Sequence, residues 1–139
     1  MAKETRCYFE KALIFGCAGC SQATRFEIGE RPVYMCRSAT AADRCERYAC
    51  LLRQNAGFVF GQTSAGNSRL SNYHEIRLQC GGLQGLSAMI YKKTGGGDFD
   101  ISALMKAVEE EHQGIERIAL DKIVPRIAAF NPRPHRKKK

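Results

Sequence analysis

Hydrophobic and polar residues recur along the chain in patterns that predict both strands and helices. Residues 25–35 alternate loosely around the sequence GERP, which predicts a hairpin. Ile76, Leu78 and Cys80 alternate with charged or polar residues, which predicts a half-buried strand over HEIRLQC and then a short helix over GLSAMIYKK. Residues 7–14 form a mixed segment that suits either a strand or a helix.

The clearest helix patterns are bounded by residues that cap or break helices. Ser38 or Thr40 can cap the segment ADRCERYACLLRQN, and Asp43 follows Thr40 at the spacing of a capping box. Asp100 can cap a second helix, and Pro125 must break, kink or begin a third. The second helix has an apolar stripe made of Ile101, Leu104, Met105 and Val108. Together these elements predict an α+β fold.

The distribution of cysteine divides the chain into two halves of one domain. Six of the seven cysteines fall within the first 50 of 139 residues. We therefore expect a single domain over residues 1–130, a size that suits one compact core. It comprises a cysteine-rich metal-binding amino-terminal half, 1–60, and a strand-plus-helices carboxy-terminal half, 73–130. Small and polar residues between them, Gly61 to Asn72, predict a connecting loop.

The composition and charge are those of a soluble globular protein with a basic tail. Hydrophobic residues make up 44% and charged residues 26% of the chain. The formal net charge is +8, but residues 131–139 supply five of the positive charges and leave +3 on the rest. This basic tail can attract phosphates or an acidic protein, or it can serve solubility alone.

The compartment decides how the cysteines are interpreted. No apolar run reaches membrane-spanning length, and the stretch Ala12 to Phe15 is much shorter than the core of a signal peptide. We therefore expect a cytoplasmic protein without a membrane span. A reducing compartment keeps thiols free, so clustered cysteines are better interpreted as metal ligands than as disulfides.

Four cysteines form the candidate site, beginning with a closely spaced pair. Cys17 and Cys20 are separated by Ala18 and Gly19, which permit the tight turn that points two sulfurs at one centre. Because the domain is modest in size, the binding free energy of a structural metal, about 10 to 16 kcal/mol for zinc peptides, suffices to order two further ligands.

Cys36 and Cys45 are the predicted remaining ligands. Cys36 lies just before the predicted helix, and Cys45 lies on its more apolar face, whereas Cys50 is about 140° away around the helix. Cys80, at the end of the predicted strand, is the alternative ligand. Cys7 and Cys50 are expected to be small buried thiols outside the site.

The spacing of these cysteines favours an iron–sulfur cluster over zinc. Structural zinc sites with four cysteines usually use two close pairs, whereas this chain has one close pair and a second pair spread over a helix. A cluster is larger than a single ion and accepts cysteines from wider separations. We favour [4Fe–4S], although the spacing matches neither ferredoxin pattern, and zinc stays the alternative.

Two functions follow from this site. The first is electron transfer or other redox chemistry with a protein partner, by a carrier that has no catalytic residues of its own. The alternative is a zinc-stabilised nucleic-acid-binding or regulatory module. Arginines interleaved with aromatic residues in the first half support nucleic-acid contact: Arg25, Arg31, Arg37, Arg44, Arg47 and Arg53 with Tyr8, Phe9, Phe26, Tyr34 and Tyr48.

Overall fold

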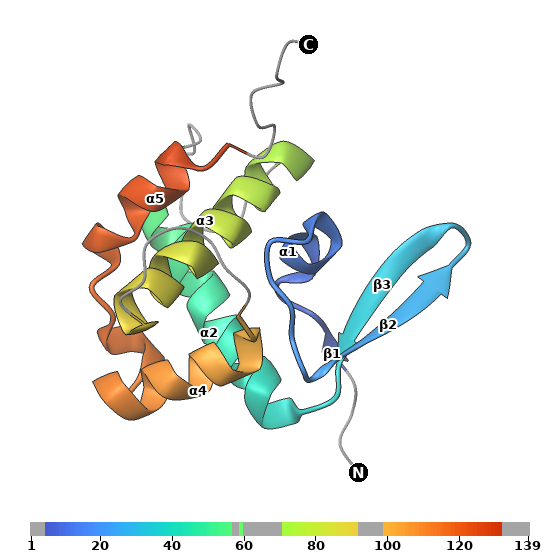
Figure 1. Cartoon of the computed structure of the whole chain (residues 1–139), viewed down its shortest axis with the longest axis horizontal. Helices are drawn as coiled ribbons and strands as arrows, with labels where there is room; N and C mark the ends of the chain where they lie inside the picture. Colours follow the sequence, from blue (N-terminus) through green and yellow to red (C-terminus); the bar gives the residue numbers. More distant parts are fainter. Residues whose placement is uncertain (1–4, 57–58, 60–70, 92–98, 132–139) are drawn as a thin grey trace.

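The structure, a computed structural model, describes residues 5–56, 59, 71–91 and 99–131 (Figure 1). It confirms the predicted α+β class, with a small sheet beside a larger group of helices. The elements in chain order are β1 (Thr5–Arg6), α1 (Glu10–Phe15), β2 (Ala23–Ile28), β3 (Arg31–Cys36), α2 (Ala39–Ala56), α3 (Asn72–Tyr91), α4 (Ile101–His112), the short 3-10 turns η2 (Ile115–Arg117) and η3 (Leu120–Lys122), and α5 (Val124–Ala129).

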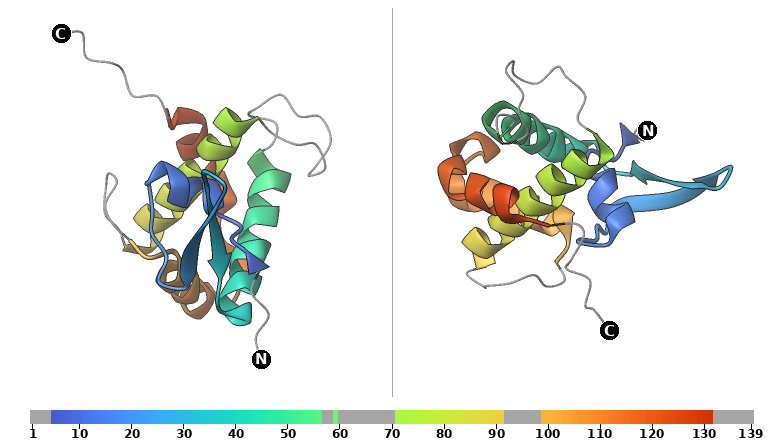
Figure 2. Two further views of the ribbon diagram at one scale, coloured as in Figure 1. Left: turned by 90° about the vertical axis from the view of Figure 1, so that its right-hand side faces the viewer. Right: turned by 90° about the horizontal axis from the view of Figure 1, so that it is seen from above.

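The sheet is antiparallel, with strand order β1-β3-β2. β2 and β3 form the hairpin that the sequence predicts, and Gly29 supplies the positive φ of 65° at its turn. The tip of this hairpin projects away from the helices (Figures 1 and 2). At the other end of β3, Cys36 lies opposite both Thr5 of β1 and Ala23 of β2, so the sheet brings three distant segments together there.

Helix α3 lies at the centre of the helical part and packs against α1, α2, α4 and α5. Its neighbours meet it through a continuous apolar core, since burial of apolar side chains is the main force that joins such helices. The largest fully buried side chains of this core are Phe9, Tyr48, Leu52, Leu78, Leu83, Leu86, Ile101, Leu104, Met105, Ile115, Ile123 and Ile127.

The strand predicted over residues 74–80 is wrong, because this segment is the first half of α3. Alternation suggested that Gln79 faces water, but Gln79 is only 7% exposed and its amide is satisfied inside the protein. One hydrogen-bond partner, Glu75, lies one helical turn away, whereas the other, the N–H of Ala12, is 67 residues away and leaves no local pattern. In the described part of residues 73–130 no named strand occurs, and Asp100 forms only an isolated bridge with Gly19.

Close helix packing explains the glycines that interrupt α3. A Cβ added at Gly81 would lie 2.6 Å from the backbone Cα of Ile127 in α5, and one at Gly82 would lie 2.6 Å from the side chain of Leu52 in α2. The two glycines therefore let neighbouring helices approach α3. They do not form the turn that a strand-to-helix interpretation requires.

The predicted helix boundaries are largely confirmed. The Ser38 hydroxyl accepts the N–H of Ala41 at 3.1 Å and so caps α2, and Asp100 accepts the N–H of Ala103 at 2.9 Å and caps α4. All four residues of the predicted apolar stripe of α4 are buried. Pro125 lies in the first turn of α5, where proline is tolerated, so it begins a helix.

Two predicted segments lie mainly outside the described residues. These are the connecting loop, apart from its last residues, and the basic tail after Asn131. Among the helices that the structure describes, none has the length and apolar character needed to cross a membrane.

Candidate metal centre

The loop that carries Cys17 and Cys20 begins where α1 ends. Gly16 closes α1 in the left-handed conformation, with φ of 94°, a geometry that glycine adopts without a steric penalty. The N–H of Cys17 then donates to the oxygen of Ala12 at 3.1 Å. Cys17 is therefore held directly against the end of the helix.

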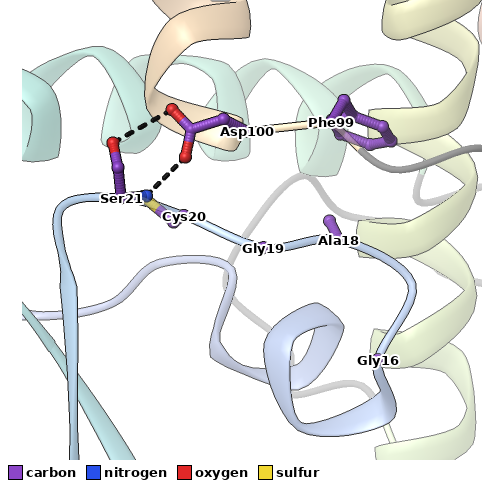
Figure 3. A pocket seen from close by; sticks show the side chains of 7 residues that line it. All are labelled: Gly16, Ala18, Gly19, Cys20, Ser21, Phe99 and Asp100. Carbon is purple, nitrogen blue, oxygen red and sulfur yellow. Dashed lines mark hydrogen bonds between the residues drawn. The ribbon is translucent and has the colours of Figure 1, made fainter.

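The same loop is tied to the start of α4 on both sides of Cys20, and Figure 3 shows the connection on the Ser21 side. On one side, the N–H of Ile101 donates to the oxygen of Gly19 at 2.8 Å. On the other, Asp100 accepts hydrogen bonds from both the backbone N–H and the hydroxyl of Ser21, the latter at 3.1 Å. These contacts fix the backbone position of Cys20.

The Cys20 thiol lies at the amino-terminal end of α4. Burial raises the pKa of this thiol, and the backbone N–H groups of Gln22 and Ser102 oppose the rise only in part. The nearby Asp100 carboxylate and Cys36 thiol add to it. An unligated Cys20 is thus a neutral thiol in ordinary buffers.

Cys36 and Cys45 lie in the interior, as the sequence predicts. Cys36, at the end of β3, is 8% exposed, and its thiol donates to the oxygen of Ser38 at 3.3 Å. Cys45, in the second turn of α2, is 7% exposed, whereas Cys50 is exposed on the opposite side. The prediction that Cys45 faces the interior and Cys50 points away from it is therefore confirmed. The separate expectation that Cys50 is a buried thiol is wrong.

Four free thiols, two buried and two partly buried, lie close enough for their charges to interact. Burial is the main cause that raises the pKa of Cys45, and the thiols of Cys7, Cys20 and Cys36 raise it further. Burial also raises the pKa of Cys7 to about 12, with contributions from Cys20 and Cys36. We call Cys7, Cys20, Cys36 and Cys45 the thiol cluster.

Cys7 is the member of the thiol cluster that the sequence did not predict. Its N–H donates to the oxygen of Tyr34 at 2.9 Å, which continues the pairing of β1 with β3. That pairing brings Cys7 near Cys36 across a long stretch of chain. Only a prediction that residues 5–6 pair with β3 could have placed Cys7 in this cluster. A strand this short shows no hydrophobic pattern from which such a pairing could be predicted.

Cys17, a predicted ligand, and Cys80, the predicted alternative to Cys45, are joined to each other. Their sulfurs are 2.16 Å apart and their Cα atoms 6.1 Å apart, which is a disulfide. The expectation of free thiols therefore does not hold for this pair. The bond connects the loop after α1 to the buried side of α3, where Cys80 is fully buried.

The thiols lie close together without enclosing an ion. Within the part of the chain that the structure describes, no three histidine, cysteine, aspartate or glutamate side chains are grouped tightly enough to hold a metal. A metal centre here requires side-chain rotations that point the sulfurs of Cys20, Cys36 and Cys45 at one centre. It also requires a fourth ligand, which is Cys7, Cys17 or Cys80.

Most of the arginines proposed as a nucleic-acid surface already have protein partners. Arg44 and Arg47 of α2 bind Glu109 of α4, with N–O distances of 2.8 and 2.7 Å. Arg53 pairs with Glu75 and Arg25 with Glu27. Two of the aromatic residues named with them, Phe9 and Tyr48, are fully buried and cannot stack on bases.

Comparison with known proteins gives no match, whether the chain is tested against protein-family models, curated proteins or solved structures. The functional conclusion therefore depends on the chemistry of its own residues.

Proposed function

We propose that the chain is a small iron–sulfur protein that exchanges electrons with a protein partner. Cys17, Cys20, Cys36 and Cys45 hold the cluster in this proposal, and [4Fe–4S] is the favoured form. The observation that carries the proposal is the proximity of Cys20, Cys36 and Cys45, which come from three separate segments: the thiols of Cys20 and Cys36 raise the pKa of Cys45, and the Cys36 thiol raises the pKa of Cys20. Thiolates are the usual ligands of such clusters.

The size of the inorganic core favours a cluster over a single zinc ion. With Zn–S bonds of about 2.3 Å, tetrahedral zinc requires four sulfurs within roughly 4 Å of one another. The described residues contain no group closed this tightly. An iron–sulfur core fills more space between its ligands, so it requires less movement of thiols that arrive from a loop, a strand end and a helix.

The fourth ligand is Cys17 because it shares a short loop with Cys20. The hydrogen bonds of Gly19 and Ser21 to the start of α4 fix this loop, so once the Cys17–Cys80 disulfide is reduced only the side chains must rotate to bind. Cys7, which already belongs to the thiol cluster, is the competing fourth ligand.

The loop also offers a route for electrons to reach the surface. Cys17 and Cys20 are partly exposed, whereas Cys36 and Cys45 are buried. An open pocket of about 530 Å³ lies beside Cys20 and is lined by Gly16, Ala18, Gly19, Ser21, Phe99 and Asp100 (Figure 3). A partner that docks there approaches the exposed edge of the cluster.

A positive charge lies next to this edge. The guanidinium of Arg37 donates hydrogen bonds to the backbone oxygens of Ser21 and Gln22. A cation in this position stabilises the electron-rich state of a nearby cluster and so raises its reduction potential. A structural zinc site has no reduction potential to adjust. The position of Arg37 therefore supports the proposed redox role over the zinc alternative.

Anaerobic purification with iron, sulfide and zinc analysis tests the proposal. We expect brown protein that contains iron and acid-labile sulfide, with a visible spectrum that bleaches on reduction. Alanine at Cys20, Cys36 or Cys45 should abolish loading, whereas the matched control Cys50→Ala, on the exposed side of α2, should load normally. Stoichiometric zinc in colourless protein would instead support the zinc-stabilised alternative.

The fourth ligand is identified by comparing Cys17→Ala with Cys7→Ala. Loss of the cluster in the former alone supports Cys17. Loss in the latter alone replaces Cys17 by Cys7 in the ligand set but leaves the iron–sulfur assignment in place.

A further inference from the structure

We infer that the Cys17–Cys80 disulfide and the metal centre compete for the sulfur of Cys17, so that oxidation of this pair closes the site. The inference rests on the proposed function, in which Cys17 is a ligand. One sulfur cannot at once form a disulfide and bind iron as a thiolate. The structure holds Cys17 bound to Cys80, which is therefore the closed state of the site.

The disulfide partner of Cys17 and its proposed co-ligand lie on different elements. Cys80 belongs to α3 and is fully buried, whereas Cys20 lies on the loop that is tied to the start of α4. The anchors of that loop, at Gly19 and Ser21, do not involve the Cys17 side chain. Breaking the disulfide therefore frees one side chain to change rotamer while the loop backbone keeps its place.

The loop is uncrowded at the glycines that flank Cys17. A Cβ added at Gly16 or Gly19 would meet no atom within 4 Å, so the backbone on both sides of Cys17 is open. Gly16 and Gly19 also line the open pocket beside Cys20, through which a small reagent reaches the loop.

The proposed oxidant is the disulfide of a small thiol, such as oxidised glutathione. The thiolate of Cys17, which is partly exposed, attacks one sulfur of this reagent and releases one molecule of the small thiol. The thiolate of Cys80 then attacks the Cys17 sulfur and releases the second. The two cysteines lose two protons and two electrons, and the small disulfide gains them and becomes two thiols.

Burial sets the order of these two steps. Cys80 is fully buried in α3, so an external reagent reaches Cys17 first and Cys80 acts as the resolving thiol. Excess small thiol reverses both steps and opens the site again. The metal centre would thus load only in a reducing environment.

The test compares metal-free protein in two oxidation states. Cys50→Ser serves as the background, because it removes an exposed thiol that would join separate molecules. One sample is fully reduced, and the other is treated with oxidised glutathione until peptide mapping finds the Cys17–Cys80 bond. Both then receive ferrous iron and sulfide without added thiol, and mapping is repeated afterwards to check that sulfide has left the bond intact.

We expect the reduced sample to load and the oxidised sample to bind at least tenfold less iron. Dithiothreitol should restore loading of the oxidised sample. The variant Cys80→Ala has no resolving thiol, so after glutathione treatment it should keep Cys17 as a mixed disulfide with glutathione, detected by mass spectrometry, and should load only after dithiothreitol removes it. In the reverse experiment, oxidised glutathione should form the Cys17–Cys80 bond in metal-free protein but not in loaded protein.

The outcomes separate the two proposals. Reduced protein that binds no iron and sulfide overturns the proposed function and the inference with it. Oxidised protein that loads fully while its Cys17–Cys80 bond stays intact overturns the inference alone and transfers the ligand role to Cys7. Failure of oxidised glutathione to form the bond in metal-free protein also overturns the inference.

Discussion

Tyr48 donates a hydrogen bond of 2.8 Å from its hydroxyl to the backbone oxygen of Gly82, and this bond joins the middle of α2 to the middle of α3. Both residues are buried, and burial raises the pKa of Tyr48, so the hydroxyl stays protonated and remains a donor. The ring also packs against Phe9, with centroids 6.1 Å apart. Helix α2, which carries Cys45, is therefore placed against α3 by a directional contact inside the apolar core, in addition to the Arg53–Glu75 ion pair.

Replacing Tyr48 by Phe should destabilise the protein by about 1 kcal/mol, because the ring stays and only the hydrogen bond is lost. Urea unfolding followed by circular dichroism measures this loss as a lower midpoint with an unchanged slope. The matched control is Tyr91→Phe, at a residue that is 40% exposed. Equal midpoints for the two variants would show that the Tyr48 hydroxyl contributes nothing to stability.

Replacing Gly81 by Ala should also destabilise the protein, although alanine favours helix by about 1 kcal/mol over glycine. The new methyl group would overlap the backbone of Ile127, which cannot rotate away, and such overpacking typically costs about 1–3 kcal/mol. The comparison variant is Gly85→Ala, where the nearest atom is a side-chain methyl of Ile123 at 3.1 Å. Thermal melting should rank Gly81→Ala below Gly85→Ala, and the reverse order would contradict this account of the helix packing.

Gln79 should matter to stability because it satisfies a backbone group of another helix. Its side-chain oxygen accepts the N–H of Ala12 at 3.0 Å, in the first turn of α1, and its amide donates to Glu75 at 3.1 Å. Gln79→Leu leaves that N–H buried without its acceptor, at a cost of about 1–3 kcal/mol.

The control for Gln79 is Gln54→Leu, the same change at an exposed position of α2. Chemical unfolding should show a clear loss for Gln79→Leu and little change for Gln54→Leu. A loss of the same size in both variants would mean that the buried hydrogen bonds of Gln79 are not its cause.

Gln79 also illustrates what the sequence could and could not predict. Patterns that depend on near neighbours were correct: the hairpin, the caps at Ser38 and Asp100, and the inward side of α2 at Cys45. The alternation that ends at Cys80 was misleading, because Gln79, a buried polar residue that accepts from the distant N–H of Ala12, looks like a solvent-facing one in the sequence. The strand prediction failed for this reason.

The candidate site shows the same division between local and distant information. The face of α2 is local information, and it placed Cys45 toward the interior correctly. The two-residue spacing of Cys17 and Cys20 is local too, but it gave no sign that Cys17 is bonded to Cys80. The nearness of Cys7 depends on the pairing of β1 with β3, and the bond between Cys17 and Cys80 depends on the packing of α1 against α3. Neither tertiary contact leaves a periodic signal in the sequence.

Thiol labelling should separate Cys50 from the thiol cluster. In metal-free reduced protein, iodoacetamide should modify the exposed Cys50 at least tenfold faster than Cys45, because alkylation needs both access and a thiolate. Burial restricts access to Cys45 and raises its pKa. Mass spectrometry of timed samples measures the two rates, with protein unfolded in urea as the control in which the rates converge. Equal rates in the folded protein would contradict the buried position of Cys45.

Acid should weaken the contact between α2 and α4 through Glu109. Hydrogen bonds from Arg47 and then Arg44 hold the pKa of Glu109 below its ordinary value of 4.5. A carboxylate whose pKa is lower in the folded state adds stability above the unfolded pKa, and this stability is lost as pH falls through the folded value. The contribution should be complete at pH 6 and should decline below about pH 4.5.

The variant Glu109→Gln tests this pH dependence. At pH 6 we expect it to be about 1 kcal/mol less stable than the unmodified protein, since a partly exposed ion-pair network is worth no more than this. The difference should shrink as the pH falls below 4, because the unmodified protein then loses the same charge. Glu110→Gln, at an exposed position of the same helix, is the matched control and should show a smaller difference at pH 6. Urea unfolding at several pH values measures each difference, and a Glu109→Gln deficit that stays constant down to pH 3 would assign the effect to side-chain shape and not to charge.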